Sequence, residues 1–356
     1  MASPILIHNN TETASAFAVD NPQPGRYSGV AEADYFAAEA VNSTTLKKMG
    51  RSALHCKADM TRSGDRPDTE AQKVGRLVHC AVLEPERFKA DYCKEPTPED
   101  FPEALVSLDD YKAKAKALGL KVGGSKDQLK ARIQEHLLDA QVALLDGKDD
   151  DELTDEENKA YFDALDKLDD PDRIFFDFIK DQLTFRKTAL KADHWHLAQA
   201  IIESIAANDK ARLALSGGVA EETLFWRDAM TGLLCKSRMD YYREDLGLIV
   251  DVKTTEDARP EAVARDIHKY GYHISAAHYL DGLQALGLPG GQSFAWVFVE
   301  KKAPYAIGLY FASADMLDRG RELHLDYLRD FARCKLSGIW PAYPGEFQTI
   351  DLPAWA

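Results

Sequence analysis

The sequence predicts an α/β (α+β) domain in which helices precede and follow a central sheet. Five short runs rich in β-branched and aromatic residues lie between residues 221 and 310, and turn sequences separate several of them. Amphipathic segments with helical spacing flank these runs on both sides. The 356 residues, 45% of them hydrophobic, suffice for one large core domain with an insertion.

Bulk composition excludes several classes of protein. The net charge of −15 argues against a passive nucleic-acid coat protein, although a basic channel can be local. Five scattered cysteines without a CxxC pair indicate a reducing compartment and argue against a structural zinc or iron–sulfur site. No apolar run approaches the roughly 20 residues that span a bilayer, and the N-terminus does not read as a signal peptide. We therefore expect a cytoplasmic protein without a membrane segment.

The chain divides by composition into an arm, a core with an insertion, and a tail. Residues 1–30 are rich in Asn, Thr, Ser, Pro and Gly without a period, which predicts a flexible arm. The core is expected to comprise residues 31–95 and 171–345, with a helical insertion over 96–170 and a tail over 346–356.

Each element follows from local sequence. A short helix begins near residues 42–49, with Asn42 or Ser43 as its N-cap, and a second helix runs from about 69 to 83 before Pro85. In the insertion, Ser125 forms a capping box with Gln128 and starts a helix after a Gly-rich turn. An acidic run over 146–158 leads to an amphipathic stretch over 159–169. Further helices are expected over about 188–208, 260–286 and 312–336, and strands over 221–226, 233–241, 248–253, 293–300 and 306–310.

A carboxylate and an ammonium share one face of the third strand. Asp251 and Lys253 are two residues apart, and a tight turn over 243–247 folds the preceding strand, with Asp240 near its end, back against them. Two carboxylates and a lysine suit phosphodiester cleavage with a hard cation such as Mg²⁺ or Mn²⁺. The alternative is a surface ion pair at a strand end. The rival triplet Glu300-Lys-Lys302 also ends an apolar strand, but no acidic residue lies on a preceding hairpin partner.

His79 adds an imidazole from a distant helix. It lies four residues after Gly75, so both share one helix face, where a glycine permits close approach of another segment or a ligand. A neutral imidazole can bind a metal. The alternative is a half-buried histidine on an apolar helix.

Together these motifs resemble the PD-(D/E)xK nuclease superfamily. Gly75–His79 fits a GxxxH motif, and Asp240 followed by Asp251-Val-Lys253 fits a D…DxK core. Within the superfamily, the chain resembles the RecE-type, exonuclease VIII-like phage and prophage exonucleases. The stretches that carry this resemblance are 41–49, 53–57, 75–85, 221–226, 232–240, 250–255, 270–279 and 338–343.

The resemblance implies a restriction-endonuclease-like core with a central mixed sheet, and a Mg²⁺-dependent 5′-to-3′ exonuclease acting on double-stranded DNA ends. It also implies a ring-like homo-oligomer, a RecT-like single-strand-annealing recombinase as partner, and a role in phage recombination inside a bacterial cell. By position, Asp240 and Asp251 would bind the metal with help from the Val252 carbonyl. His79 would lie beside the metal and Lys253 would position the water.

Two features extend or depart from this resemblance. Glu221 falls where the family often has an acidic residue, but Glu222 is adjacent and the two are not separable by position. Tyr279 matches a Gln-xxx-Tyr motif of related nucleases, whereas Ser275 replaces the glutamine. The alternative for Tyr279 is a helix-packing aromatic.

The insertion resembles a SAP-type DNA-binding motif. Its lysines, Lys121, Lys126 and Lys130 among them, suit phosphate contacts, and the alternative is a solvated helical hairpin. For the whole chain, the alternatives to a duplex exonuclease are an endonuclease or single-strand nuclease with the same site, and a non-catalytic DNA-binding phage protein.

Overall fold

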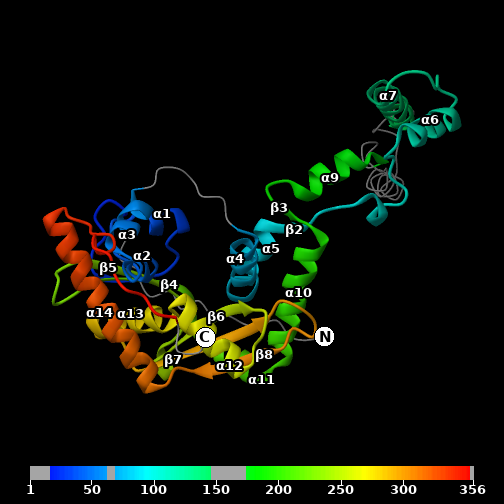
Figure 1. The fold of residues 1–356 in the computed structure, drawn as a ribbon. Helices are drawn as coiled ribbons and strands as arrows, with labels where there is room; N and C mark the ends of the chain where they lie inside the picture. The colour runs from blue at the N-terminus through cyan, green and yellow to red at the C-terminus, as the bar shows by residue number, and fades with distance from the viewer. Residues whose placement is uncertain (1–16, 62–68, 146–173, 353–356) are drawn as a thin grey trace. The chain divides into compact units, whose positions relative to one another are not determined.

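The computed structural model describes residues 17–61, 69–145 and 174–352, and two compact units divide the chain. The first unit comprises Met1–Arg87 with His196–Ala356, and the second comprises Phe88–Trp195. Figure 1 shows the elements of both. In the described part of the chain, no helix combines the length and the apolar character needed to cross a membrane.

A six-stranded mixed sheet forms the centre of the first unit. Its strand order is β1-β4-β5-β6-β7-β8, in which β6 and β7 pair in parallel and the other neighbours pair antiparallel. The central strands carry nearly continuous runs of buried residues, which place side chains on both faces, as a doubly covered sheet requires. The strands are β1 (Gly25–Tyr27), β4 (Val219–Arg227), β5 (Leu234–Arg243), β6 (Leu248–Thr255), β7 (Ser293–Glu300) and β8 (Ile307–Phe311).

Helices cover both faces of this sheet (Figure 1). One face packs on α2, α3, α12, α13 and α14 around Trp226, Met239 and Trp296. The other face packs on α4, α10 and α11 around Val78, Ile201 and Val252. The bounds are α1 (Glu32–Ala37), α2 (Ser43–Met49), α3 (Ala53–Met60), α4 (Glu70–Leu83), α10 (Ala192–Ala207), α11 (Asp209–Ala214), α12 (Pro260–Tyr270), α13 (Tyr272–Ala285) and α14 (Ala314–Ser337).

The mixed sheet between helices confirms the predicted fold class, but two local expectations within the first unit are wrong. Residues 25–27 of the predicted flexible arm form the edge strand β1, because they pair with β4 and bury Tyr27 against Phe225. The helix predicted over 260–286 is two helices, because Gly271 adopts a φ of 64° between them. Residues 1–16 of the predicted arm lie outside the described residues.

The second unit contains a small sheet and a helical hairpin. The parallel pair β2 and β3 includes residues 188–190, which were expected to be helical; pairing with β2 holds them extended, and α10 begins at Ala192. The hairpin α6–α7 encloses Tyr111, Leu129 and Phe175. The acidic run 146–158 and the helix predicted over 159–169 lie outside the described residues. The elements are α5 (Pro85–Asp91), which crosses the unit boundary, β2 (Tyr92–Lys94), a 3-10 turn (Pro98–Asp100), α6 (Leu108–Ala117), α7 (Lys126–Leu145), α9 (Phe176–Thr184) and β3 (Thr188–Leu190).

A buried chain of polar groups joins α13, α14 and β5. His278 Nε2 lies 2.9 Å from the Lys236 carbonyl oxygen, and His278 Nδ1 lies 3.0 Å from His324 Nε2. His324 Nδ1 lies 3.2 Å from a carboxylate oxygen of Asp281, which also accepts a hydrogen bond from Arg321. Burial, with the neighbouring His324, lowers the pKa of His278 to about 3. The folded core therefore holds His278 neutral.

We expect this histidine to weaken the fold in mild acid. Below its ordinary pKa of about 6.5 an unfolded histidine takes up a proton, whereas His278 in the folded chain does so only near 3. Stability is therefore lost as the pH falls between these values, by about 2 kcal/mol from this group between pH 6.5 and 5. Denaturant unfolding of the wild type and His278→Asn at both pH values measures it. Equal pH dependence in the two proteins would contradict the expectation.

Candidate active site

The site begins where strands β5 and β6 part. Their pairing covers Tyr241↔Val250, Tyr242↔Ile249 and Arg243↔Leu248, next to the tight turn. Beyond this point the Asp240 side chain replaces a backbone acceptor of β5, because its Oδ2 accepts a hydrogen bond of 2.9 Å from the Val252 N–H. The hairpin thus holds a buried carboxylate between two diverging strands, as the sequence predicts.

Helix α4 brings His79 to the same point. Thr69 and Gln72 form a capping box that starts the helix, and Val74 and Val78 bury its apolar face against the sheet. His79 Nε2 lies 2.6 Å from the Val252 carbonyl oxygen and 3.5 Å from Asp240 Oδ2. The imidazole therefore does reach the strand pair from a segment more than 150 residues away.

Asp251 and Lys253 lie together on β6. Lys253 Nζ is 2.5 Å from Asp251 Oδ2, 3.5 Å from Asp240 Oδ2 and 3.2 Å from the Val252 carbonyl oxygen. One ammonium group therefore links both predicted carboxylates. The Asp251 side chain is buried and the Lys253 side chain is only 22% exposed, which argues against the alternative of an exposed ion pair at a strand end.

The structure separates the adjacent glutamates. Glu222 is buried and accepts hydrogen bonds from Arg26, at 2.5 Å, and from Ser28. Glu221 instead forms a cluster with His79 and Asp240, in which one ligand atom from each residue lies within 4.8 Å of the others. Glu221 also has a φ of 54°, a left-handed conformation that costs a non-glycine residue on the order of 1–3 kcal/mol. Such strain is commonly found at functional sites.

We expect Glu221, and not Glu222, to contribute to metal binding. Glu221→Gln should weaken Mn²⁺ affinity at least about tenfold, because even residues that only support metal ligands cost that much when changed. Glu222→Gln is the matched control, since its side chain contacts Arg26 and Ser28. Isothermal titration with Mn²⁺ measures both variants. The assignment is wrong if the two variants bind alike.

The charges in this cluster influence one another strongly. Burial and the charge of Asp240 raise the pKa of Glu221 to about 8. Burial and Asp240 likewise raise the pKa of Asp251 to about 6. Burial alone would raise the pKa of Asp240, but His79, Lys253 and the Val252 N–H keep it below its usual value. Burial would lower the pKa of Lys253, but Asp240 and Asp251 raise it further, so Lys253 stays protonated.

The donor set fits a divalent cation. An imidazole and two carboxylates converge within the cluster, and the Val252 carbonyl oxygen lies beside the imidazole. Oxygen-rich sites of this kind suit Mg²⁺ or Mn²⁺. Burial and the charge of Asp240 raise the pKa of Glu221, and a bound cation would stabilise its ionised form. Asp251 lies outside this cluster, because its carboxylate pairs with Lys253.

An open pocket is lined in part by Asp251 and Lys253. Lys47, which the sequence analysis did not single out, lines it, and burial and the charge of Lys253 lower the pKa of Lys47 to about 8. Ser275 and Tyr279 line it as well, so the short serine leaves space where a glutamine would project. The lining residues are Ser43, Thr44, Lys47, Asp251, Lys253, Tyr272, Ser275, Tyr279, Phe294 and Trp296.

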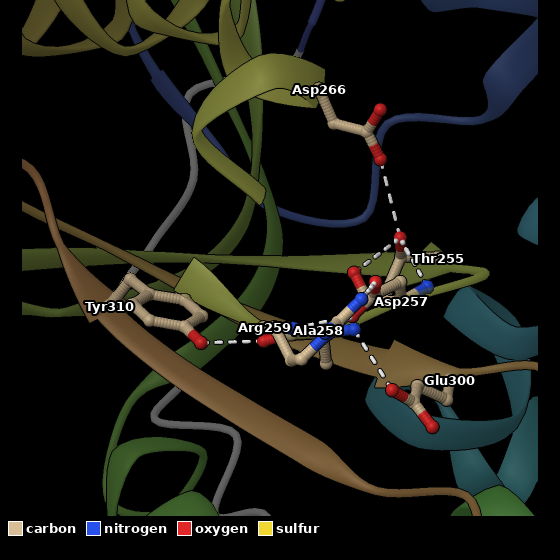
Figure 2. Close-up of polar contacts among 7 residues, drawn as sticks. All are labelled: Thr255, Asp257, Ala258, Arg259, Asp266, Glu300 and Tyr310. Carbon is tan, nitrogen blue, oxygen red and sulfur yellow. Dashed lines mark hydrogen bonds and ion pairs between the residues drawn. The ribbon is translucent and has the colours of Figure 1, made fainter. Parts of the chain in front are cut away.

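A network of hydrogen bonds fixes the chain where it leaves β6 (Figure 2). Thr255 Oγ1 donates to Asp266 at 3.2 Å, and the Ala258 N–H donates to Glu300 at 2.9 Å. Tyr310 donates to the Ala258 carbonyl oxygen at 2.5 Å. The network anchors the segment that follows Lys253 to α12, β7 and β8.

This network also accounts for the rival triplet at 300–302. Glu300 binds the Ala258 N–H, while Lys301 and Lys302 pair with Glu256 at 2.6 and 3.2 Å. These residues therefore hold a loop, and Asp251 and Lys253 remain the better candidates. Around Gly75, no atom of the described chain comes within 4 Å of where a Cβ would lie.

The predicted DNA-contacting lysines of the second unit differ in surroundings. Lys121 is exposed, and Arg132 donates hydrogen bonds to the carbonyl oxygens of Lys121 and Gly123. Lys126 Nζ lies 5.3 Å from the centre of the Tyr111 ring and Lys130 Nζ lies 5.1 Å from that of Phe175. DNA binding by these lysines stays a prediction.

The mixed sheet with Asp240 and Asp251-Val-Lys253 at its parting strands defines a PD-(D/E)xK-type protein. Residues 42–353 match the family described as "PDDEXK-like domain of unknown function (DUF3799)", and the chain belongs to this family. Among solved structures, the chain is similar to the "Putative exonuclease" of Eubacterium rectale at 13% identity and a TM-score of 0.46, over 88% of this chain and 90% of that chain. No curated protein sequence matches the chain.

Proposed function

We propose that this protein is a metal-dependent 5′-to-3′ exonuclease that resects double-stranded DNA ends. The observation that supports the proposal most is the convergence of His79, Glu221 and Asp240 beside the ion pair of Asp251 and Lys253. Imidazole, carboxylates and a protonated amine around one point are the groups that metal-assisted phosphodiester hydrolysis needs. Membership in the PDDEXK-like family supports the reaction class, and the resemblance to RecE-type exonucleases supports the substrate and polarity.

Each residue has a proposed role. A divalent cation, Mg²⁺ with Mn²⁺ as a substitute, held by His79, Glu221 and Asp240 would stabilise the negative charge that develops on the scissile phosphate. Lys253, held by Asp251, is aimed at the same region and would donate a hydrogen bond to the attacking water or to a phosphate oxygen. By resemblance, Asp251 and the Val252 carbonyl would also bind metal, and Tyr279 would contact DNA from the pocket wall.

The proposal includes the setting of the reaction. A resected end is single-stranded, so an annealing recombinase is the partner that could use the product, as the resemblance implies. The same resemblance supports a ring-like homo-oligomer that encloses the duplex, and action inside a bacterial cell during phage-type recombination. Lys121, Lys126 and Lys130 of the second unit would add phosphate contacts.

Digestion of duplexes labelled at one end tests the proposal. With Mg²⁺, the expected result is release of mononucleotides from the 5′ end of linear duplex DNA, no release without metal, and no cutting of closed-circular duplex. Cutting of circular DNA would instead indicate an endonuclease, and preference for unpaired strands a single-strand nuclease. Binding of DNA without any metal-dependent cleavage would overturn the proposal in favour of a non-catalytic DNA-binding protein.

A further inference from the structure

Two tyrosines flank the turn between α12 and α13 and stack on each other. The ring centres of Tyr270 and Tyr272 are 5.6 Å apart, with 29° between the ring planes. Gly271 makes this arrangement possible, because its φ of 64° is unfavourable for other residues. A Cβ at Gly271 would also lie 2.8 Å from Cδ of Lys47, so the glycine lets that side chain pass close to the turn.

The inner ring belongs to the active-site pocket. Tyr272 lines the pocket together with Asp251 and Lys253. Lys253 Nζ lies 5.6 Å and Lys47 Nζ 5.9 Å from the centre of the Tyr272 ring. A strand whose phosphate reaches Lys253 would therefore pass close to the Tyr272 ring.

The outer ring faces solvent beside a further ammonium group. Tyr270 is 48% exposed, although it is a large aromatic residue. Lys269 is exposed and its Nζ lies over this ring, 4.9 Å from the ring centre, so its flexible side chain must swing aside where a base stacks. The ring stack thus runs from the pocket to the surface, with a cation at each end. Exposed aromatic rings bordered by basic side chains are how proteins hold unpaired nucleic-acid strands.

We propose that Tyr270, supported from behind by Tyr272, is a stacking platform for an unpaired nucleobase next to the scissile phosphate. The proposal rests on the proposed function, because it takes the pocket to be a DNA site. Stacking on a ring does not depend on base identity, which suits an enzyme that removes every nucleotide in turn. The ammonium groups of Lys47 and Lys253 face the strand's phosphates, while Tyr270 takes the base.

Fluorescence and equilibrium binding test the platform without cleavage. The full chain is mixed, with Ca²⁺ in place of Mg²⁺, with a single-stranded oligonucleotide that carries 2-aminopurine at its end, and gels confirm that the strand stays intact. Stacking on the wild type should quench the fluorescence. Tyr270→Phe should keep this quenching, and Tyr270→Leu should remove it and weaken binding about tenfold. Phe311→Leu, a change of an exposed aromatic on β8, is the matched control and should behave as wild type.

An oligonucleotide whose terminal base is missing separates stacking from general damage. The wild type should bind the strand without the terminal base about as weakly as Tyr270→Leu binds the intact strand. Tyr270→Leu should bind the two strands with equal affinity. The platform would be overturned if Tyr270→Leu lost the same affinity for both strands. It would also be overturned if Phe311→Leu lost as much affinity, or if the wild type bound neither strand. No step of this experiment needs hydrolysis, so the two proposals can fail separately. If binding depends on both the terminal base and Tyr270 but the protein does not cleave DNA, only the exonuclease proposal is refuted. If the protein cleaves DNA but binding shows no such dependence, only the platform is refuted.

Discussion

We expect Asp240→Asn to reduce metal-dependent DNA cleavage about a thousandfold. Asp240 belongs to the cluster with His79 and Glu221, and its carboxylate also faces Lys253. Asparagine keeps an oxygen that can accept the Val252 N–H, so the strand geometry survives while the negative charge is lost. A bound metal contributes several kcal/mol of charge stabilisation in the transition state, and about 4 kcal/mol corresponds to a thousandfold in rate.

The measurement is the initial rate of nucleotide release at saturating Mg²⁺, with thermal unfolding of each protein as a check on the fold. Asp245→Asn is the matched control, since Asp245 pairs with Arg243 by the same hairpin but lies outside the cluster. It should keep nearly the wild-type rate. If Asp240→Asn cleaves DNA within about tenfold of wild type, the metal centre has been assigned to the wrong carboxylate.

The largest effect on stability is expected from Gly320→Ala. Gly320 is buried in α14, and an added Cβ would lie 2.2 Å from the backbone oxygen of His273 in α13. Backbone cannot swing aside as a side chain can, so the two helices must separate. Forcing extra volume into a packed interior costs about 3 kcal/mol in unfavourable cases, which would lower the Tm by about 6–12 °C.

Gly75→Ala is the matched control for Gly320→Ala, because it is the same substitution in another helix. Gly75 lies in α4, and nothing in the described chain lies within 4 Å of its would-be Cβ. Alanine there should raise stability by about 0.5–1 kcal/mol, since glycine is the more flexible residue in an unfolded chain. Calorimetry of both variants measures the contrast. A Gly320→Ala protein as stable as wild type would show that α13 and α14 are not in close contact.

Local sequence predicts which side chains meet at the end of β6, but by itself it leaves open whether they form a functional site or a surface ion pair. The alternation on β6 places Asp251 and Lys253 on one face, and the tight turn after β5 brings Asp240 to them; both features are local and appear in the structure. His79 depends on long-range packing, and its position was inferred from a motif rather than from periodicity. The structure confirms that it lies within 3.5 Å of Asp240.

Other residues could not be assigned from sequence for physical reasons. Glu221 and Glu222 are adjacent, so they point to opposite sides, and only the sheet's environment decides which side holds Arg26 and which holds His79. In the sequence, Lys47 cannot be distinguished from an ordinary lysine on a helix surface. Its side chain passes close to Gly271, more than 200 residues later, where a larger residue would clash with it. Strand β1 has three residues and no pattern of its own, and it exists only because β4 offers an edge.

The unequal pairing of β6 has a consequence for how the reaction centre is aimed. On one side β6 loses β5 after Val250, but on the other it pairs with β7 along its whole length, from Leu248↔Ser293 to Thr255↔Glu300. The position of the backbone around Asp251 and Lys253 is therefore set by its hydrogen-bonded pairing with β7. Strand β7 supplies none of the proposed metal ligands. Conservative changes of side-chain size in β7 should nevertheless alter the rate of DNA cleavage, because they would tilt β6 and move Asp251 and Lys253.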